Sequence, residues 1–288
     1  MAAALACAVG TSLCYGVGSV LQAAGATGAP PAEGLDPRLL LVLARSWQYP
    51  LGLALDAAGF VLSLVALRSL PLYVVQSVVA SFLAVTAVVA VVALGLRMQR
   101  LDVVALVAVV LGLTLVGLSA APQSAPAVGL RTQGLTLAVS LALVLGSVPL
   151  GRTSRRGSVW MLGGVAGLAF GTVAVAARIL SASVTRGRVV DDVQVLVGAP
   201  ASYALLVAAP LALVAYATAL QRGSVVAATA PLVVGETVLP ALAGLSLLGD
   251  HTRSGWGLPA TLGFALAVGA SLLLSRFGEV GAAEPARR

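Results

Sequence analysis

Residues 224–248 read SVVAATAPLVVGETVLPALAGLSLL, a stretch of 25 residues in which Glu236 is the one charged side chain. A helix needs about 20 consecutive apolar residues to cross the roughly 30 Å of hydrocarbon in a bilayer. The stretch is long enough, and its apolar residues are continuous rather than alternating, which argues against a strand. It therefore predicts a membrane-spanning helix with an acid near its middle.

Eight further apolar runs meet the same criterion, so the sequence predicts an all-α bundle of about nine membrane-spanning helices. The bounds of these runs are 2–26, 47–68, 71–95, 103–120, 132–150, 158–181, 200–220 and 258–276. Residues 38–46 are apolar but too short to span, and they are interpreted as an interfacial helix or as the remnant of a tenth span. We expect one integral membrane domain over residues 1–288, with a polar tail over 277–288.

The composition agrees with a membrane protein, because hydrophobic residues make up 59% of the chain and charged residues only 9%. A soluble domain usually carries about 25% charged residues. This contrast argues against a soluble enzyme, a nucleic-acid-binding domain and a disordered chain. No charged residue precedes Glu33, so the first run is interpreted as a permanent span rather than a secretory signal. With one histidine and two cysteines, the sequence predicts no cofactor.

The arginines predict the orientation of the chain. All 17 basic residues are arginines, of which 11 fall on one side of a nine-span topology and 6 on the other. Cytoplasmic loops carry the excess of basic residues. We therefore expect a multi-pass protein of the plasma (inner) membrane with its C-terminus in the cytoplasm and its N-terminus outside. The net charge of +7 is then a topology signal, and no nucleic-acid partner is expected.

An internal repeat divides the chain into two halves, 1–120 and 132–276. Residues 66–71 (ALRSLP) and 219–224 (ALQRGS) both join two adjacent spans, at an offset of 153 residues. The same offset relates Arg100 to Arg253. An odd number of spans in each half would give the halves opposite orientations. Inverted repeats of this kind are typical of secondary transporters.

The stretches ALRSLPLYVVQS (66–77) and ALQRGSVVAATAP (219–231) resemble the drug/metabolite transporter superfamily, which includes the EamA-type carriers. The nine-span layout is most similar to that of the NIPA-like magnesium transporters. Residues 15–19 (YGVGS) and several single residues fit the spacing of that family: Trp47, Gly52, Gly59, Pro71, Tyr216 and Pro231. The family has an acid where this chain has Phe60, and here Asp56 lies about one turn earlier. The EamA-type Gly-Glu-Arg signature is present only as Gly249-Asp250-His251. The resemblance implies ten spans with one shortened, and a cation such as magnesium as the substrate.

Two acids, Asp56 and Glu236, lie inside predicted spans. A charge at bilayer depth costs roughly 2.5–3.5 kcal/mol on insertion scales, so such residues usually serve a purpose. They either line a transport cavity or are protonated, hydrogen-bonded packing residues. In a shared cavity they could bind a divalent metal through oxygen ligands, or exchange protons that drive solute movement.

Other polar residues at span depth are candidates for the same cavity or for hydrogen bonds between helices. They are Tyr15, Gln22, Gln76, Ser77, Tyr216, Thr237 and Arg178. Thr237 is expected to satisfy carbonyls that the prolines around Glu236 leave free. Arg178 either extends to the interface or pairs with Glu236 or an anionic substrate.

Two further features are expected to be structural. Gly163, Gly167 and Gly171 form a row of small residues that lets helices approach closely, as do Gly263, Ala267 and Ser271. Asp250 and His251 are expected to lie in a surface turn.

The sequence therefore predicts a secondary transporter that moves a small cationic solute, such as a divalent metal, by alternating access. Its partners would be the lipid bilayer and that solute, and a homodimer is compatible with the sequence. Two alternatives remain: a proton-coupled exporter of a small metabolite or organic cation, and a non-transporting membrane partner or subunit that binds lipid-linked intermediates. An enzyme is not expected, because no Ser/His/Asp arrangement, phosphate loop or paired-carboxylate catalytic site stands out.

Overall fold

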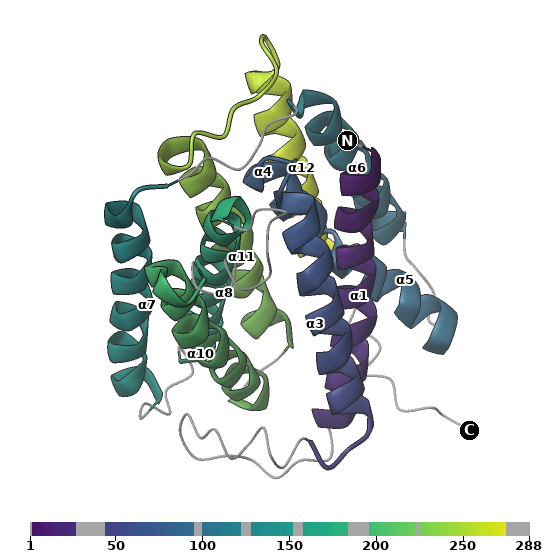
Figure 1. The fold of residues 1–288 in the computed structure, drawn as a ribbon. Coiled ribbons are helices and arrows are strands. Elements are labelled where there is room, and N and C mark those ends of the chain that lie inside the picture. The colour runs from purple at the N-terminus through teal and green to yellow at the C-terminus, as the bar shows by residue number, and fades with distance from the viewer. Residues whose placement is uncertain are drawn as a thin grey trace, which may run out of the picture.

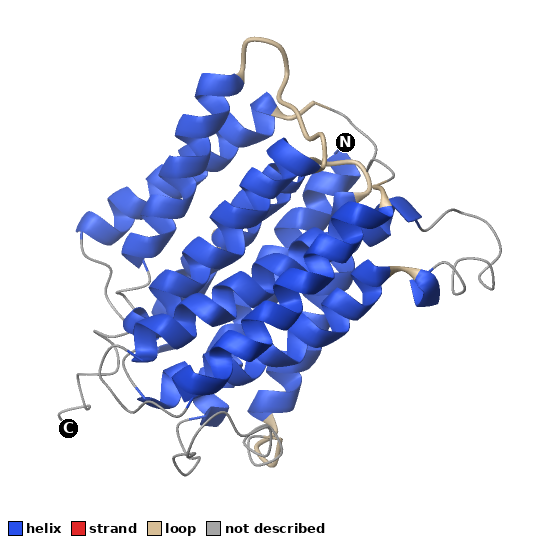
Figure 2. Cartoon of the chain, turned by 90° about the vertical axis from the view of Figure 1, so that its left-hand side faces the viewer, coloured by secondary structure: helices blue, strands red, loops and turns tan. Residues whose placement is uncertain are grey.

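The computed structural model describes residues 2–26, 44–94, 100–121, 128–151, 158–183, 196–222 and 225–274. The helices pack side by side into a bundle (Figure 1), and most of the described loops gather at one end of it (Figure 2). In chain order the helices are α1 (Ala2–Ala26), α3 (Gln48–Leu67), α4 (Leu72–Ala80), α5 (Phe82–Leu94), α6 (Arg100–Ser119), α7 (Leu130–Gly151), α8 (Ser158–Ser183), α10 (Pro200–Arg222), α11 (Val225–Leu247) and α12 (Gly257–Leu274).

The apolar runs predicted the helices closely, because every helix or helix pair begins and ends within about three residues of its run. Among the described residues, seven spans are long and apolar enough to cross a membrane, and α11 and α12 each contain a shorter apolar stretch. The protein is therefore a multi-pass membrane helix bundle. Of the predicted segment 38–46, residues 38–43 lie outside the described residues, and residues 44–46 form turns.

The run predicted over 71–95 is divided into α4 and α5 by a break at Ser81. The Ser81 hydroxyl hydrogen-bonds to the carbonyl of Val78 at 2.6 Å, and it lies 2.9 Å from the hydroxyl of Ser12 in α1. Such local side-chain bonds compete with regular helix geometry. Every residue of α4 is buried, so this short helix lies inside the bundle.

The first helix of each half packs against two later helices of the same half. Helix α1 packs against α3 and α5, and α8 packs against α10 and α11. Helix α6 packs against α12, and α4 against α11, while α7 lies at the edge beside α10 and α8 (Figure 1).

The predicted row of glycines on α8 is confirmed as a close helix contact. A Cβ atom added at Gly171 would lie 2.7 Å from the carbonyl oxygen of Gly235 in α11, and Gly163 and Gly167 meet the α11 backbone in the same way. Gly263 and Ala267 of the row on α12 approach α6 in the same way, since a Cβ at Gly112 would lie 2.6 Å from the carbonyl oxygen of Gly263 and from the backbone nitrogen of Ala267. Close approach of backbones replaces the hydrophobic driving force that is missing between helices in lipid.

A buried ion pair joins α8 to the connection between α11 and α12. The Nη2 atom of Arg178 lies 2.8 Å from Oδ1 of Asp250, and the two side chains are 1% and 0% exposed. Nη1 of Arg178 donates to the carbonyl oxygens of Leu67 and, at 2.9 Å, Leu70. Oδ2 of Asp250 accepts the backbone N–H of Leu72 at 2.6 Å. This ion-pair network therefore fastens α8, the turn between α3 and α4, and the α11–α12 connection to one another.

The expectation that Asp250 lies in a surface turn is wrong, although His251 beside it is exposed. Gly249 adopts a φ of 70°, a left-handed conformation that glycine tolerates and that ends α11. The chain then turns back, so that Asp250 enters the bundle. A backbone bond from Arg253 N–H to the Ser119 carbonyl, at 2.9 Å, holds the rest of the connection on the end of α6.

Replacement of Gly167 by alanine should destabilise the bundle, because the new Cβ would collide with the backbone of Leu232. We expect the free energy of unfolding in detergent to fall by about 1–3 kcal/mol. Gly164→Ala is the matched control, since a Cβ there meets nothing within 4 Å and alanine favours the helix. Equal loss of stability in both variants would contradict the close packing of α8 on α11.

Removal of one member of the ion pair should cost more than removal of both. Arg178→Leu or Asp250→Leu leaves an unpaired buried charge, for which we expect a loss of about 3–5 kcal/mol. The double variant buries no charge, so it should regain most of this loss. A double-mutant cycle of unfolding free energies in detergent measures the difference. Strictly additive losses would show that the two side chains act independently.

Candidate functional site

The two intramembrane acids lie on different helices, Asp56 on α3 and Glu236 on α11, each near the middle of its helix. Their charges are close enough to interact, and both also interact electrostatically with Tyr15 of α1. These three candidate residues are therefore close enough to interact, although α11 packs mainly against α8 and α4 rather than against α1 or α3.

Helix α1 packs against α3 next to Asp56. The amide Nε2 of Gln22 donates a hydrogen bond to Oδ2 of Asp56 at 2.5 Å. A Cβ at Gly18 would lie 2.7 Å from Oδ1, so the absence of a side chain there makes room for the carboxylate. The sequence placed Gln22 at membrane depth, but nothing in it indicated that Asp56 would be its partner.

Two tyrosines, Tyr15 and Tyr49, interact electrostatically with the acids. The ring of Tyr15 packs on Gly59 of α3, where a Cβ would lie 2.7 Å from Cε1 of the ring, and its side chain interacts with that of Ser63. Tyr49 of α3 interacts electrostatically with Asp56 and with Tyr216 of α10. We call Tyr15, Tyr49, Asp56, Tyr216 and Glu236 the acid–tyrosine cluster. Four helices contribute to it, and Tyr49 is the member that the sequence did not suggest.

Other predicted site residues have their described contacts elsewhere. The hydroxyl of Thr237 donates to the Val233 carbonyl at 2.6 Å, within α11, and not to the Glu236 carbonyl that Pro240 leaves free. Gln76 is 3% exposed on α4, and its Oε1 has no hydrogen-bond partner among the described residues. Arg178 pairs with Asp250 and not with Glu236.

The acid–tyrosine cluster offers a cation two carboxylates. Among the described residues there is no group of three or more His, Cys, Asp or Glu side chains that could hold a metal ion. One oxygen of Asp56 already accepts a hydrogen bond from Gln22, whereas the structure gives the Glu236 carboxylate no hydrogen bond within the described part of the chain. A divalent metal bound between Asp56 and Glu236 would therefore take most of its oxygen ligands from water, as magnesium commonly does.

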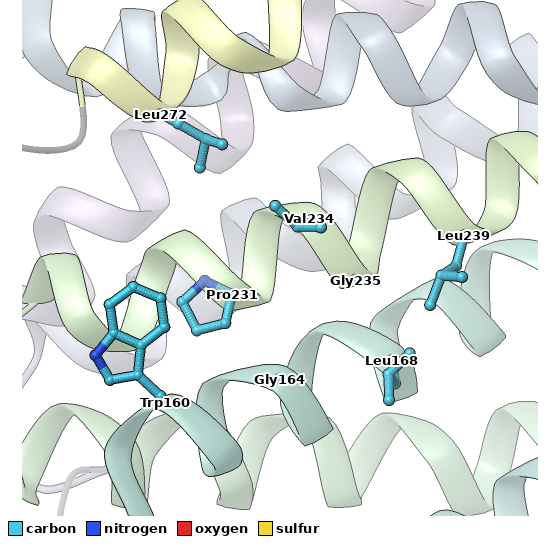
Figure 3. Close-up of a pocket in the computed structure, with 8 residues that line it drawn as sticks. All are labelled: Trp160, Gly164, Leu168, Pro231, Val234, Gly235, Leu239 and Leu272. Carbon is cyan, nitrogen blue, oxygen red and sulfur yellow. The ribbon is translucent and has the colours of Figure 1, made fainter. Parts of the chain in front are cut away.

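An apolar groove of about 570 Å³ lies between α8, α11 and α12 (Figure 3). Its lining residues carry no charge: Trp160, Gly164, Leu168, Pro231, Val234, Gly235, Leu239 and Leu272. Glu236 is absent from the lining although its neighbour Gly235 is present, because successive residues of a helix point about 100° apart. The groove is thus separate from the acid–tyrosine cluster.

The chain was compared with protein-family models, curated proteins and solved structures. None of these comparisons gives a match.

Proposed function

We propose that the protein is a secondary transporter that moves a small cationic solute, such as the divalent metal magnesium, by alternating access. The observation that carries this proposal is the electrostatic interaction between Asp56 and Glu236, each of which lies near the middle of its helix. Two neighbouring acids inside a membrane are costly to ionise, and a bound cation would offset both their mutual repulsion and their lost hydration. A cation is therefore the ligand that this pair of carboxylates favours.

The order of helix packing supports two inverted repeats within a bundle of nine spans. At an offset of about 153 residues, α1, α3, α4–α5 and α6 correspond to α8, α10, α11 and α12. Helix α1 packs against α3 and α5 as α8 packs against α10 and α11, and the pairs α4–α11 and α6–α12 join the halves. We place the cation site at the junction of the halves, as in other transporters built from such repeats.

Interrupted helices near the site support movement of the halves. Pro231 and Pro240 flank Glu236 within α11, α10 contains Pro210, and Ser81 separates α4 from α5. Prolines remove backbone hydrogen bonds and allow a helix to bend, and broken helices are common around transporter sites. By the arginine count, the C-terminus is on the cytoplasmic side and the N-terminus outside.

The tyrosines favour a second candidate cargo, an organic cation exported in exchange for protons. Tyr15, Tyr49 and Tyr216 belong to the same cluster as the acids. Aromatic faces attract ammonium groups, whereas a strongly hydrated metal gains little from them. Flux of metals and of organic ammonium ions into proteoliposomes, with internal pH recorded, separates the two candidates.

Neutralisation of Glu236 should abolish transport while leaving the fold intact. Glu236→Gln keeps the shape of the side chain but removes its charge, so we expect cation flux in proteoliposomes to fall by at least about tenfold, the effect of 1.4 kcal/mol in binding. Asp56→Asn should act in the same direction. Asp102→Asn serves as the control, because Asp102 lies in the first turn of α6, outside the cluster. Wild-type flux through the double variant Glu236→Gln with Asp56→Asn would refute the proposal.

A further inference from the structure

The ion-pair network lies at the end of the bundle where α3, α6, α8 and α11 finish, which we call the Asp250 end (Figure 1, top). Besides the contacts of Arg178 and Asp250, the hydroxyl of Tyr73 in α4 donates to the Ser119 carbonyl at 3.2 Å. Thr252 forms an isolated antiparallel bridge with Ala120. The ends of four long helices and the start of α4 are therefore held together at one place.

Large apolar side chains are also fully buried at this end. Five of the largest fully buried side chains in the described chain belong to one hydrophobic cluster near this end: Leu67, Leu70, Leu72, Ile179 and Leu248. We call these five residues the leucine plug. The leucine plug and the ion-pair network are thus both buried at the Asp250 end of the bundle.

The acid–tyrosine cluster lies deeper along the same helices. Asp56 precedes Leu67, the last residue of α3, by about three helical turns, which corresponds to roughly 16 Å. Glu236 precedes Leu247, the last residue of α11, by the same length. A solute passing between the cluster and the Asp250 end would have to cross the plug and the network.

We propose that the ion-pair network and the leucine plug form a gate, which closes the Asp250 end and opens when Arg178 and Asp250 separate. This inference rests on the proposed transport function. A site that is exposed to each side of the membrane in turn must be closed at one end and reopened later. The structure then represents the state in which the Asp250 end, the outer end by the arginine count, is closed.

The chemistry of the contact favours a gate over a permanent tie. A buried ion pair adds little net stability compared with well-packed apolar side chains, because both charges lose their hydration. When such a pair separates at the end of a bundle, water returns to both charges and offsets the lost attraction. The Nε atom of Arg178 has no hydrogen-bond partner among the described residues, so even in the closed state the guanidinium is incompletely satisfied. A contact made of apolar groups alone would gain no favourable hydration when it opened.

Ser63 provides a reporter for the path behind the gate. It lies on α3 between Asp56 and Leu67 and is 7% exposed. Because the chain has only Cys7 and Cys14, the background Cys7→Ala with Cys14→Ala is free of cysteine, and Ser63→Cys then adds one nearly isosteric thiol. The rate of its reaction with a charged, membrane-impermeant thiol reagent measures how often water reaches this depth. Ser254→Cys, in the exposed connection, identifies the side of the membrane that the Asp250 end faces, and the lipid-facing Val61→Cys gives the unreactive baseline.

Asp250→Asn keeps an oxygen for the Leu72 N–H but leaves Arg178 without its counter-charge. The closed state should lose stability relative to the open one, so we expect Ser63→Cys to react at least about tenfold faster from the Ser254 side. Reaction from the opposite side should not accelerate. An unchanged or slower rate from the Ser254 side would refute the gate.

The variant Arg178→Leu with Asp250→Leu tests the gate independently, in case Asp250→Asn labels faster only because it is misfolded. Its apolar contact should hold the end closed, so that Ser63→Cys reacts more slowly than in the otherwise unchanged chain and cation flux is lost although folding is retained. A labelling rate equal to that of the unchanged chain would overturn the proposal. The labelling rates need no substrate, so absence of flux in every chain would count against the transport function, whereas unaltered labelling would count against the gate.

Discussion

The buried contact between Arg178 and Asp250 determines which segments meet at the Asp250 end of the bundle. These residues are 72 positions apart, and their bonds reach back to Leu67, Leu70 and Leu72 in the first part of the chain. The two side chains are buried, so each partner depends on the others to satisfy its polar groups. Once Arg178 is buried, the turn after α3, the end of α8 and the connection after α11 have to meet at one point.

Below this contact the helices are held by backbone proximity. In lipid there is no hydrophobic gain when two apolar helices meet, so association depends on close packing and on polar bonds between helices. Glycines supply the packing where α8 meets α11 and α6 meets α12. Hydroxyl pairs supply the bonds between α1 and α5, where Ser19 lies 3.0 Å from Thr86. The bundle therefore combines one buried polar junction at its end with many close backbone contacts along its length.

The sequence predicted what is local and missed what depends on distant partners. The helices follow from the length of each apolar run, a property of adjacent residues. The break at Ser81 was missed because the apolar run continues through it. Asp250 looked like a turn residue, since nothing near it in the sequence reveals Arg178. The acids were found because charge at membrane depth is rare. The Gln22 bond depends on how α3 packs against α1, and the place of Tyr49 depends on its interactions with Asp56 and with Tyr216 of α10.

The acid pair and the ion-pair network share two helices. Helix α3 carries Asp56 and ends at Leu67, whose carbonyl accepts a bond from Arg178, while α11 carries Glu236 and leads into Asp250. If both acids are ionised, repulsion between Asp56 and Glu236 would act to separate α3 from α11, whereas the network holds their ends together. On the proposed function, a cation bound between the acids removes this repulsion. The force that the ion-pair network has to resist then falls. Cation binding at the two acids would then also control when the Asp250 end opens. This coupling requires α3 and α11 to transmit movement from the acids to their ends at the network.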